Sequence, residues 1–152
     1  MKIIHTLIAT AFGAGFSPFA PGTVGALLAC GVLWFLEKLN WLTTYSFSFL
    51  VLILICTGLG VVSTNYLEKH WGKDPSKVVI DEVIGMWIAI AFIPFSYINI
   101  LLAFILFRFF DIAKPLGVRK LEKLPGGIGV MADDVLAGIY SNLILHLIII
   151  FI

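Results

Sequence analysis

The chain has 152 residues, a length that suits one domain, here taken as residues 1–152. Hydrophobic residues make up 61% and charged residues 12%, against roughly 45–50% and about 25% in an average soluble protein. This composition excludes a disordered chain and an ordinary cytosolic globule, and the net charge of +1 argues against a nucleic-acid partner, which would need a basic face. We therefore expect a membrane protein.

The first segment is short and apolar. Residues 2–12 begin with a lysine, as a signal peptide does, but the apolar stretch is brief and contains His5 and Thr6. We interpret it as a short helix that is interfacial or packed against the rest of the protein.

Longer apolar segments follow, and the one over residues 83–107 decides the topology. It carries no charge, but Pro94-Phe95-Ser96 interrupts it. Read as one helix, it would cross the membrane once; read as two helices, it forms a hairpin. Asp74-Pro75 is typical of a helix start and predicts a first helix from Pro75 to about Ile93. Ser96 can then cap a second helix that ends at Lys114, before Pro115.

The distribution of positive charge favours the hairpin. If the N-terminus is inside and the chain crosses at 24–40, 45–64, 82–93, 97–110 and 135–152, every basic residue except Lys38 lies on the inner side. We therefore predict an all-α integral membrane bundle with about four to five membrane-embedded helices and additional short interfacial helices. The charged loops would face the cytoplasm.

Five carboxylates lie on that same inner side: Asp81, Glu82, Asp111, Asp133 and Asp134. Any one of them has a simple structural explanation, such as an ion pair between Arg108 and Asp111 or a cap on a last helix that Asp133 and Asp134 open. Charges at a membrane edge are costly, however, and five together indicate a functional site. Carboxylate oxygens suit Mg²⁺ bound beside a substrate phosphate.

Basic and glycine-containing segments add candidate phosphate ligands. Arg108, Asp111 and Lys114 share one stripe of a predicted helix, so the two cations could bind phosphate beside the carboxylate. Thr23 is placed at the start of a helix predicted from Val24, where backbone N–H groups favour an anion. Gly127 lies in a Gly-rich loop that permits close backbone approach.

Four stretches in this order resemble the phosphatidylglycerophosphatase A family. They are Phe16-Ser17-Pro18-Phe19-Ala20-Pro21-Gly22-Thr23-Val24-Gly25, Asp74-Pro75-Ser76-Lys77-Val78-Val79-Ile80-Asp81-Glu82-Val83-Ile84-Gly85, Phe107-Arg108-Phe109-Phe110-Asp111-Ile112-Ala113-Lys114-Pro115 and Gly126-Gly127-Ile128-Gly129-Val130-Met131-Ala132-Asp133-Asp134-Val135-Leu136-Ala137-Gly138. The resemblance implies a Mg²⁺-dependent lipid phosphatase of the bacterial inner membrane with its active site facing the cytoplasm. Its substrate would be phosphatidylglycerophosphate and its products phosphatidylglycerol and inorganic phosphate.

The resemblance also suggests roles for the polar residues. Asp81, Glu82 and Asp134 would be catalytic, with Asp81 orienting or deprotonating the attacking water. Direct attack by water and a covalent aspartyl-phosphate intermediate both remain open. The expected metal ligands are Glu82, Asp111, Asp133 and Asp134, and the expected phosphate ligands are Arg108, Lys114, Thr23 and Gly127.

Two other functions are compatible with the residues. A phosphatase for another phosphorylated lipid head group would need the same chemistry, because no residue in the sequence identifies glycerol. A small ion-coupled transporter would also place carboxylates at helix ends, although the chain shows no internal repeat. The sequence does not determine the oligomeric state.

Overall fold

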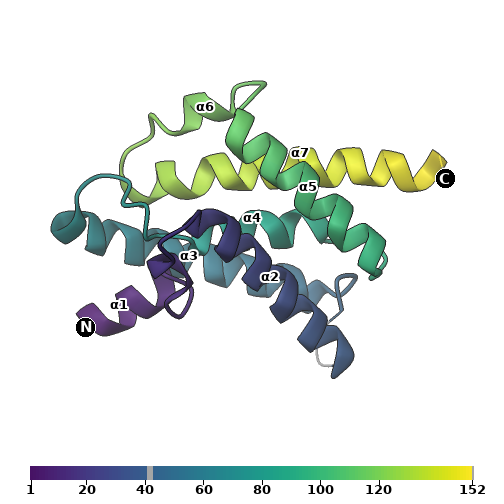
Figure 1. Ribbon diagram of the computed structural model, residues 1–152, viewed down its shortest axis with the longest axis horizontal. Coiled ribbons are helices and arrows are strands. Elements are labelled where there is room, and N and C mark those ends of the chain that lie inside the picture. The colour runs from purple at the N-terminus through teal and green to yellow at the C-terminus, as the bar shows by residue number, and fades with distance from the viewer. Residues whose placement is uncertain (41–42, 152) are drawn as a thin grey trace.

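The computed structural model describes residues 1–40 and 43–151, and within these residues the secondary structure is entirely helical (Figure 1). This confirms the predicted all-α class. The helices are α1 (Lys2–Ala9), α2 (Pro21–Lys38), α3 (Phe47–Trp71), α4 (Ile80–Ile90), α5 (Tyr97–Ala113), α6 (Val118–Leu121) and α7 (Gly126–Phe151), with a short 3₁₀ helix, η1 (Ala14–Phe16).

The centre of the bundle is α4, a helix of 11 residues that contacts α2, α3, α5 and α7. It is apolar on nearly every side, and a helix of that kind is stable only when it is surrounded by other elements. Seven of its residues are buried, among them Ile84, Met86 and Ile90. Figure 1 shows α4 in the middle of the molecule, with α7 above it, α2 below it and α5 running diagonally past it.

The predicted break between two helices is confirmed. After α4 ends at Ile90, the chain turns and α5 begins at Tyr97, where the Ser96 hydroxyl accepts a hydrogen bond from the Asn99 backbone N–H at 3.1 Å. As expected, α5 ends at Ala113, just before Lys114-Pro115. The start of α4 and the end of α5 line the same cavity, so the two helices form an antiparallel hairpin.

Side chains from outside the hairpin stabilise the turn. The Asn142 amide donates to the carbonyl groups of Ala89 and Ala91, at 3.2 and 2.8 Å. The Thr44 hydroxyl donates to the Ile93 carbonyl at 2.7 Å. Backbone groups at a helix end must find partners when water is excluded, and these bonds supply them.

The start of α4 differs from the prediction. Asp74-Pro75 begins only a single turn, with the Val78 N–H bonded to the Pro75 carbonyl, and α4 itself begins at Ile80. The Val79 N–H donates instead to the Ala9 carbonyl at the end of α1, at 2.8 Å. This tertiary hydrogen bond overrides the local helix signal, and it shows that the N-terminal segment forms a packed helix.

The start of α7 also differs from the prediction. The helix begins at Gly126, so Asp133 and Asp134 lie about two turns inside it and do not open it. The Asn65 side chain on α3 accepts the Gly127 N–H at 2.7 Å. This capping group comes from 62 positions away in sequence, which explains why local signals did not reveal the helix start.

Two helices, α3 and α7, are long and apolar enough to cross a membrane, judged by length and composition. Both carry exposed aliphatic side chains, such as Leu54, Leu143 and Ile150, on their outer faces. Apolar surface of this kind indicates a membrane or partner contact. The expected count of four to five membrane-embedded helices is not confirmed, and Ile152, at the end of the last predicted crossing, lies outside the described residues.

Replacing Asn142 with alanine removes the side-chain donor for two carbonyl groups at the end of α4. We expect the free energy of unfolding to fall by about 1–3 kcal/mol, because those groups lose a partner in a water-poor region. Thermal unfolding in detergent, followed by circular dichroism, measures the loss. Asn99→Ala, which removes an exposed hydrogen bond to the Pro94 carbonyl, is the matched control and should cost less than about 1 kcal/mol. Equal stability of the two variants would contradict the prediction.

Candidate functional site

A cavity of about 640 Å³ opens at the end of the bundle where α2, α4 and α7 begin and α5 ends. Its walls carry eight of the nine carboxylate side chains in the chain and three basic side chains. The carboxylates are Glu68, Asp74, Asp81, Glu82, Asp111, Glu122, Asp133 and Asp134, and the basic residues are Lys73, Arg108 and Lys114. All five carboxylates singled out from the sequence therefore meet in one place.

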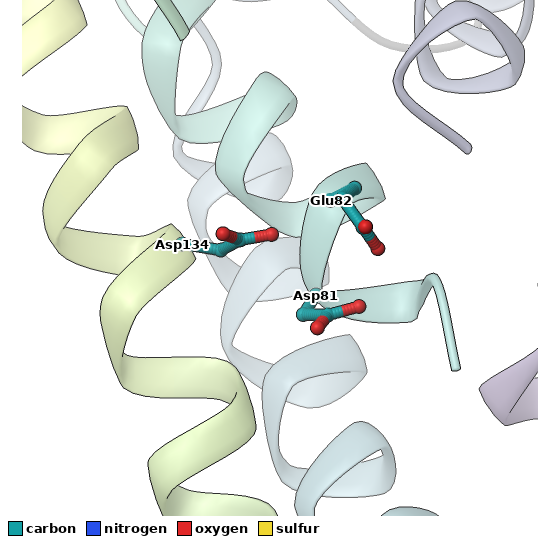
Figure 2. A group of neighbouring side chains, drawn as sticks. All are labelled: Asp81, Glu82 and Asp134. Carbon is teal, nitrogen blue, oxygen red and sulfur yellow. The ribbon is translucent and has the colours of Figure 1, made fainter. Parts of the chain in front are cut away.

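Asp81, Glu82 and Asp134 form the tightest group within the cavity. Figure 2 shows Asp134 reaching from α7 toward the first turn of α4, which carries the other two. One carboxylate oxygen from each residue lies within 4.8 Å of the others. We call these three residues the carboxylate triad. These are the three residues that the family resemblance implies are catalytic, and the geometry adds Asp81 to Glu82 and Asp134 as a candidate metal ligand.

Each member of the carboxylate triad has an oxygen that is buried without a hydrogen-bond partner: Asp81 Oδ1, Glu82 Oε2 and Asp134 Oδ2. Burial, reinforced by the neighbouring Glu82 carboxylate, raises the pKa of Asp81 well above its usual range. Buried carboxylates without partners are costly, and a bound cation offsets that cost. The donor set therefore fits a hard divalent cation.

Close helix packing brings the carboxylate triad together. A Cβ atom on Gly85 of α4 would lie 2.8 Å from the Asp134 carbonyl oxygen, and a Cβ on Gly138 of α7 would overlap the Gly85 carbonyl. Only glycine permits this approach at either position, as at close helix contacts in membranes. The backbones of α4 and α7 therefore touch one turn away from the triad.

The start of α2 forms another wall of the cavity. Ala20 adopts a left-handed conformation (φ 42°) before Pro21, and this places Gly22 against the Glu82 carboxylate, where a Cβ would overlap Oε1. The sequence pointed to Thr23 as one of four phosphate ligands, but the helix begins at Pro21 and Thr23 is not among the residues that line the cavity. Gly22 was missed because its role depends on a residue 60 positions away.

Arg108 occupies the α5 side of the cavity. Its Nη1 donates to Asp111 Oδ2 at 2.5 Å, as the three-residue spacing predicted, while its Nε is buried without a partner. The guanidinium thus retains an unused donor beside the carboxylates. A fork of this kind is suited to a phosphate oxygen.

Lys114 is more constrained than expected. It follows the end of α5 in a left-handed conformation (φ 47°), and its Nζ donates to Asp133 Oδ2 and to Glu122 Oε1, each at 2.6 Å. Partial burial disfavours its charge, but the two carboxylate partners outweigh burial and raise the pKa of Lys114. Lys114 therefore joins the end of α5 to α7 and to the segment after α6.

The remaining predicted residues lie around or outside this arrangement. Asp111 and Asp133 line the cavity as ion-pair partners of Arg108 and Lys114, outside the carboxylate triad. Gly127 packs against Val61 of α3 and does not line the cavity. A metal-binding role for Asp111 and Asp133, and phosphate binding by Thr23 and Gly127, stay predictions.

Sequence reasoning missed the loop between α3 and α4. Lys73 and Asp74 line the cavity, and Glu68 holds the loop by accepting the Asp74 N–H at 3.2 Å. Gly72 and Asp74 both have positive φ angles, of 87° and 48°. The expected helix start at Asp74-Pro75 concealed this loop, because it assigned Asp74 to a cap.

The cavity of this helical protein combines carboxylates that could hold a metal ion with basic side chains suited to phosphate, and these are the groups that a phosphatase needs. The phosphatidylglycerophosphatase A family model matches residues 7–149 of this chain. The chain belongs to the phosphatidylglycerophosphatase A family and is a phosphatase. This assignment favours the enzyme over the ion-coupled transporter.

Three relatives cover nearly the whole chain. A protein of Bacteroides thetaiotaomicron, provisionally named a phosphatidylinositol-3-phosphatase, is 50% identical over 95% of this chain and 92% of its own length. Phosphatidylglycerophosphatase A of Escherichia coli is 37% identical over 93% and 81% of the two chains, and that of Haemophilus influenzae is 41% identical over 93% and 85%. No solved structure matches this chain.

Gly22→Ala should impair the site without unfolding the protein. The new methyl group would displace the carboxylate end of the flexible Glu82 side chain, which moves at less cost to the fold than backbone would but then leaves the carboxylate triad. We expect phosphate release to fall by about ten- to a hundredfold, as small misplacements in active sites do, with an unchanged thermal midpoint. Gly31→Ala, on the same helix with open space around it, is the control and should retain activity. A fully active Gly22→Ala variant would exclude close contact between Gly22 and Glu82.

Proposed function

We propose that this phosphatase hydrolyses phosphatidylglycerophosphate to phosphatidylglycerol and inorganic phosphate with Mg²⁺ as its cofactor. The observation that carries the proposal is the carboxylate triad, whose three partnerless oxygens lie in one cavity with the unused Nε donor of Arg108. Two relatives named phosphatidylglycerophosphatase A support the choice of substrate.

The carboxylate triad would hold Mg²⁺, because hard oxygen donors that lack other partners are what this ion takes in proteins. When bound, Mg²⁺ would neutralise phosphate charge and polarise the phosphoryl oxygens. The composition of the cavity supports this requirement. Eight carboxylates against three basic side chains would repel a phosphate dianion unless a cation were present.

The other residues of the cavity would bind and orient the substrate. Arg108 donates from Nε to a non-bridging phosphate oxygen, while Asp111 fixes its guanidinium. Lys114 contributes positive charge at the cavity wall and keeps Asp133 in place. Asp81 would use one carboxylate oxygen for Mg²⁺ and the other to orient the attacking water and accept its proton as the water oxygen bonds to phosphorus. The bond from phosphorus to the lipid oxygen breaks, and that oxygen leaves as the alcohol after taking up a proton.

We also propose that the protein acts as a single domain in the bacterial inner membrane with this cavity on the cytoplasmic side. The apolar helices α3 and α7 and the bias of basic residues toward one side support this placement. The exposed apolar residues of α3 and α7 would then contact lipid.

A second candidate substrate is a phosphorylated inositol lipid. The relative that is 50% identical is named for a phosphatase of phosphatidylinositol 3-phosphate. The reacting group would again be a phosphomonoester on a lipid head group. The same residues would therefore perform the reaction.

Loss of one triad carboxylate should abolish turnover. Glu82→Gln and Asp134→Asn preserve size but remove a charged ligand, and we expect phosphate release from phosphatidylglycerophosphate to fall by at least about a thousandfold, equivalent to about 4 kcal/mol. EDTA should have the same effect on the wild type. Glu37→Gln is the matched control, because Glu37 is the carboxylate that does not line the cavity. Near-normal rates in both triad variants would refute the metal-site assignment.

Metal binding should also be visible without catalysis. If Mg²⁺ relieves repulsion within the carboxylate triad, it should stabilise the folded protein by about 2.7 kcal/mol at a hundredfold excess over its Kd. Thermal unfolding in detergent with Mg²⁺ or with EDTA measures this gain. The gain should vanish in Asp134→Asn and persist in Glu37→Gln; an equal gain in both variants would place the ion elsewhere.

A further inference from the structure

A second, more open hollow adjoins the cavity. It is lined by Asn65, Glu68, Lys69, Lys73, Pro125 and Gly126, and it shares three of these residues, Glu68, Lys73 and Gly126, with the cavity. We call it the lysine hollow. Because the two share wall residues, a ligand that occupies the cavity can extend into the lysine hollow.

The lysines of this hollow differ from the other cations nearby. Arg108 and Lys114 are bound to carboxylates inside the cavity, whereas Lys69 and Lys73 form no salt bridge within the described part of the chain. Glu68, the acidic residue of this hollow, accepts the Asp74 N–H and thereby holds the loop that carries Lys73. Lys73 is thus a positioned cation whose charge is available to a ligand.

The substrate classes in the relatives' names share one feature beyond the phosphomonoester. Phosphatidylglycerophosphate and phosphatidylinositol 3-phosphate both contain a phosphodiester that links the head group to diacylglycerol. That second anion accompanies the reacting phosphate into any site that binds the head group. The eight carboxylates that line the cavity would repel this second anion, and the lysines of the lysine hollow would attract it.

We propose that the lysine hollow binds the phosphodiester of the lipid head group, so that the enzyme selects lipids with a second phosphate beside the phosphomonoester. This inference rests on the proposed lipid phosphatase activity. Lys73 lines both the cavity and the lysine hollow, and it would make the main interaction with the phosphodiester. Lys69 lines the lysine hollow but not the cavity, and it would make a weaker interaction.

Binding of the two reaction products tests the two subsites separately. Phosphatidylglycerol retains the phosphodiester, and inorganic phosphate represents the reacting group. We would titrate each, with Mg²⁺ present, into the protein in dodecyl maltoside, a detergent without phosphate, using a short-chain phosphatidylglycerol and calorimetry. Lys73→Ala should weaken phosphatidylglycerol binding by about tenfold, as expected for loss of one charge-assisted hydrogen bond, and leave inorganic phosphate binding unchanged.

Further variants sharpen the test. Lys69→Ala should weaken phosphatidylglycerol binding less than Lys73→Ala, and Lys73→Arg should preserve it. Lys120→Ala is the matched control, because Lys120 is an exposed basic residue that lines neither the cavity nor the lysine hollow. In steady-state kinetics, Lys73→Ala should raise KM for phosphatidylglycerophosphate with little change in kcat.

Other results would overturn the proposal. Weaker binding of inorganic phosphate in Lys73→Ala would assign Lys73 to the reacting phosphate, and unchanged binding of both ligands would exclude Lys73 from either subsite. Failure of the proposed function has a different signature. In that case the wild-type protein would bind phosphatidylglycerol through Lys73 but release no phosphate from phosphatidylglycerophosphate. This result would support the lysine hollow as a phosphodiester subsite and refute the proposed activity.

Discussion

Repulsion between carboxylates is the interaction around which this protein is organised. A chain with only nine acidic residues gathers eight of them around one cavity, at the end of a bundle made mainly of apolar side chains. Such a group would expand if the elements that carry it could move. Arg108 and Lys114 counter part of the charge, and Lys114 ties three segments together through two carboxylates. The rest of the repulsion is opposed by packing and, in the proposed function, by Mg²⁺.

The helix α4 supplies much of that packing. Its first turn carries two members of the carboxylate triad, and the remainder is buried among four other helices. At its far end, Asn142 and Thr44 bind the carbonyl groups of the turn to α5. The charged end of α4 is therefore held by an apolar body and a hydrogen-bonded terminus. A buried anchor of this kind allows a short helix to present costly charges at a fixed position.

Features set by neighbouring residues could be predicted from the sequence. Ser96 as a helix cap, the end of α5 before Pro115, and the Arg108–Asp111 pair all depend on residues within a few positions of one another. The acidic residues of the site were also found, because charge is rare in so apolar a chain. The family resemblance also set Asp81, Glu82 and Asp134 apart as catalytic, but the closeness of their oxygens and the pairing of Asp133 with Lys114 depend on helix packing and could not be predicted from the sequence.

Features set by distant residues were missed or misplaced. The start of α4 depends on a hydrogen bond from Val79 to Ala9, and the start of α7 depends on Asn65. Gly22 lines the site because of Glu82, and Lys73 because the loop after α3 folds across the cavity. At the two helix starts, a tertiary contact outweighed a local preference of about 1 kcal/mol.

The contact between α4 and α7 at Gly85 and Gly138 affects the size of the cation that the carboxylate triad could bind. Because main-chain atoms touch there, the backbones that carry Asp134 and Asp81 are held close together, and a backbone contact cannot relax as easily as packed side chains do. Oxygen ligands lie about 2.0–2.1 Å from Mg²⁺ and about 2.3–2.6 Å from Ca²⁺. Closely spaced backbones limit how far these carboxylates can spread, and so they would favour the smaller ion. The absence of side chains at Gly85 and Gly138 would thus contribute to the choice of cation, although neither residue contacts the ion.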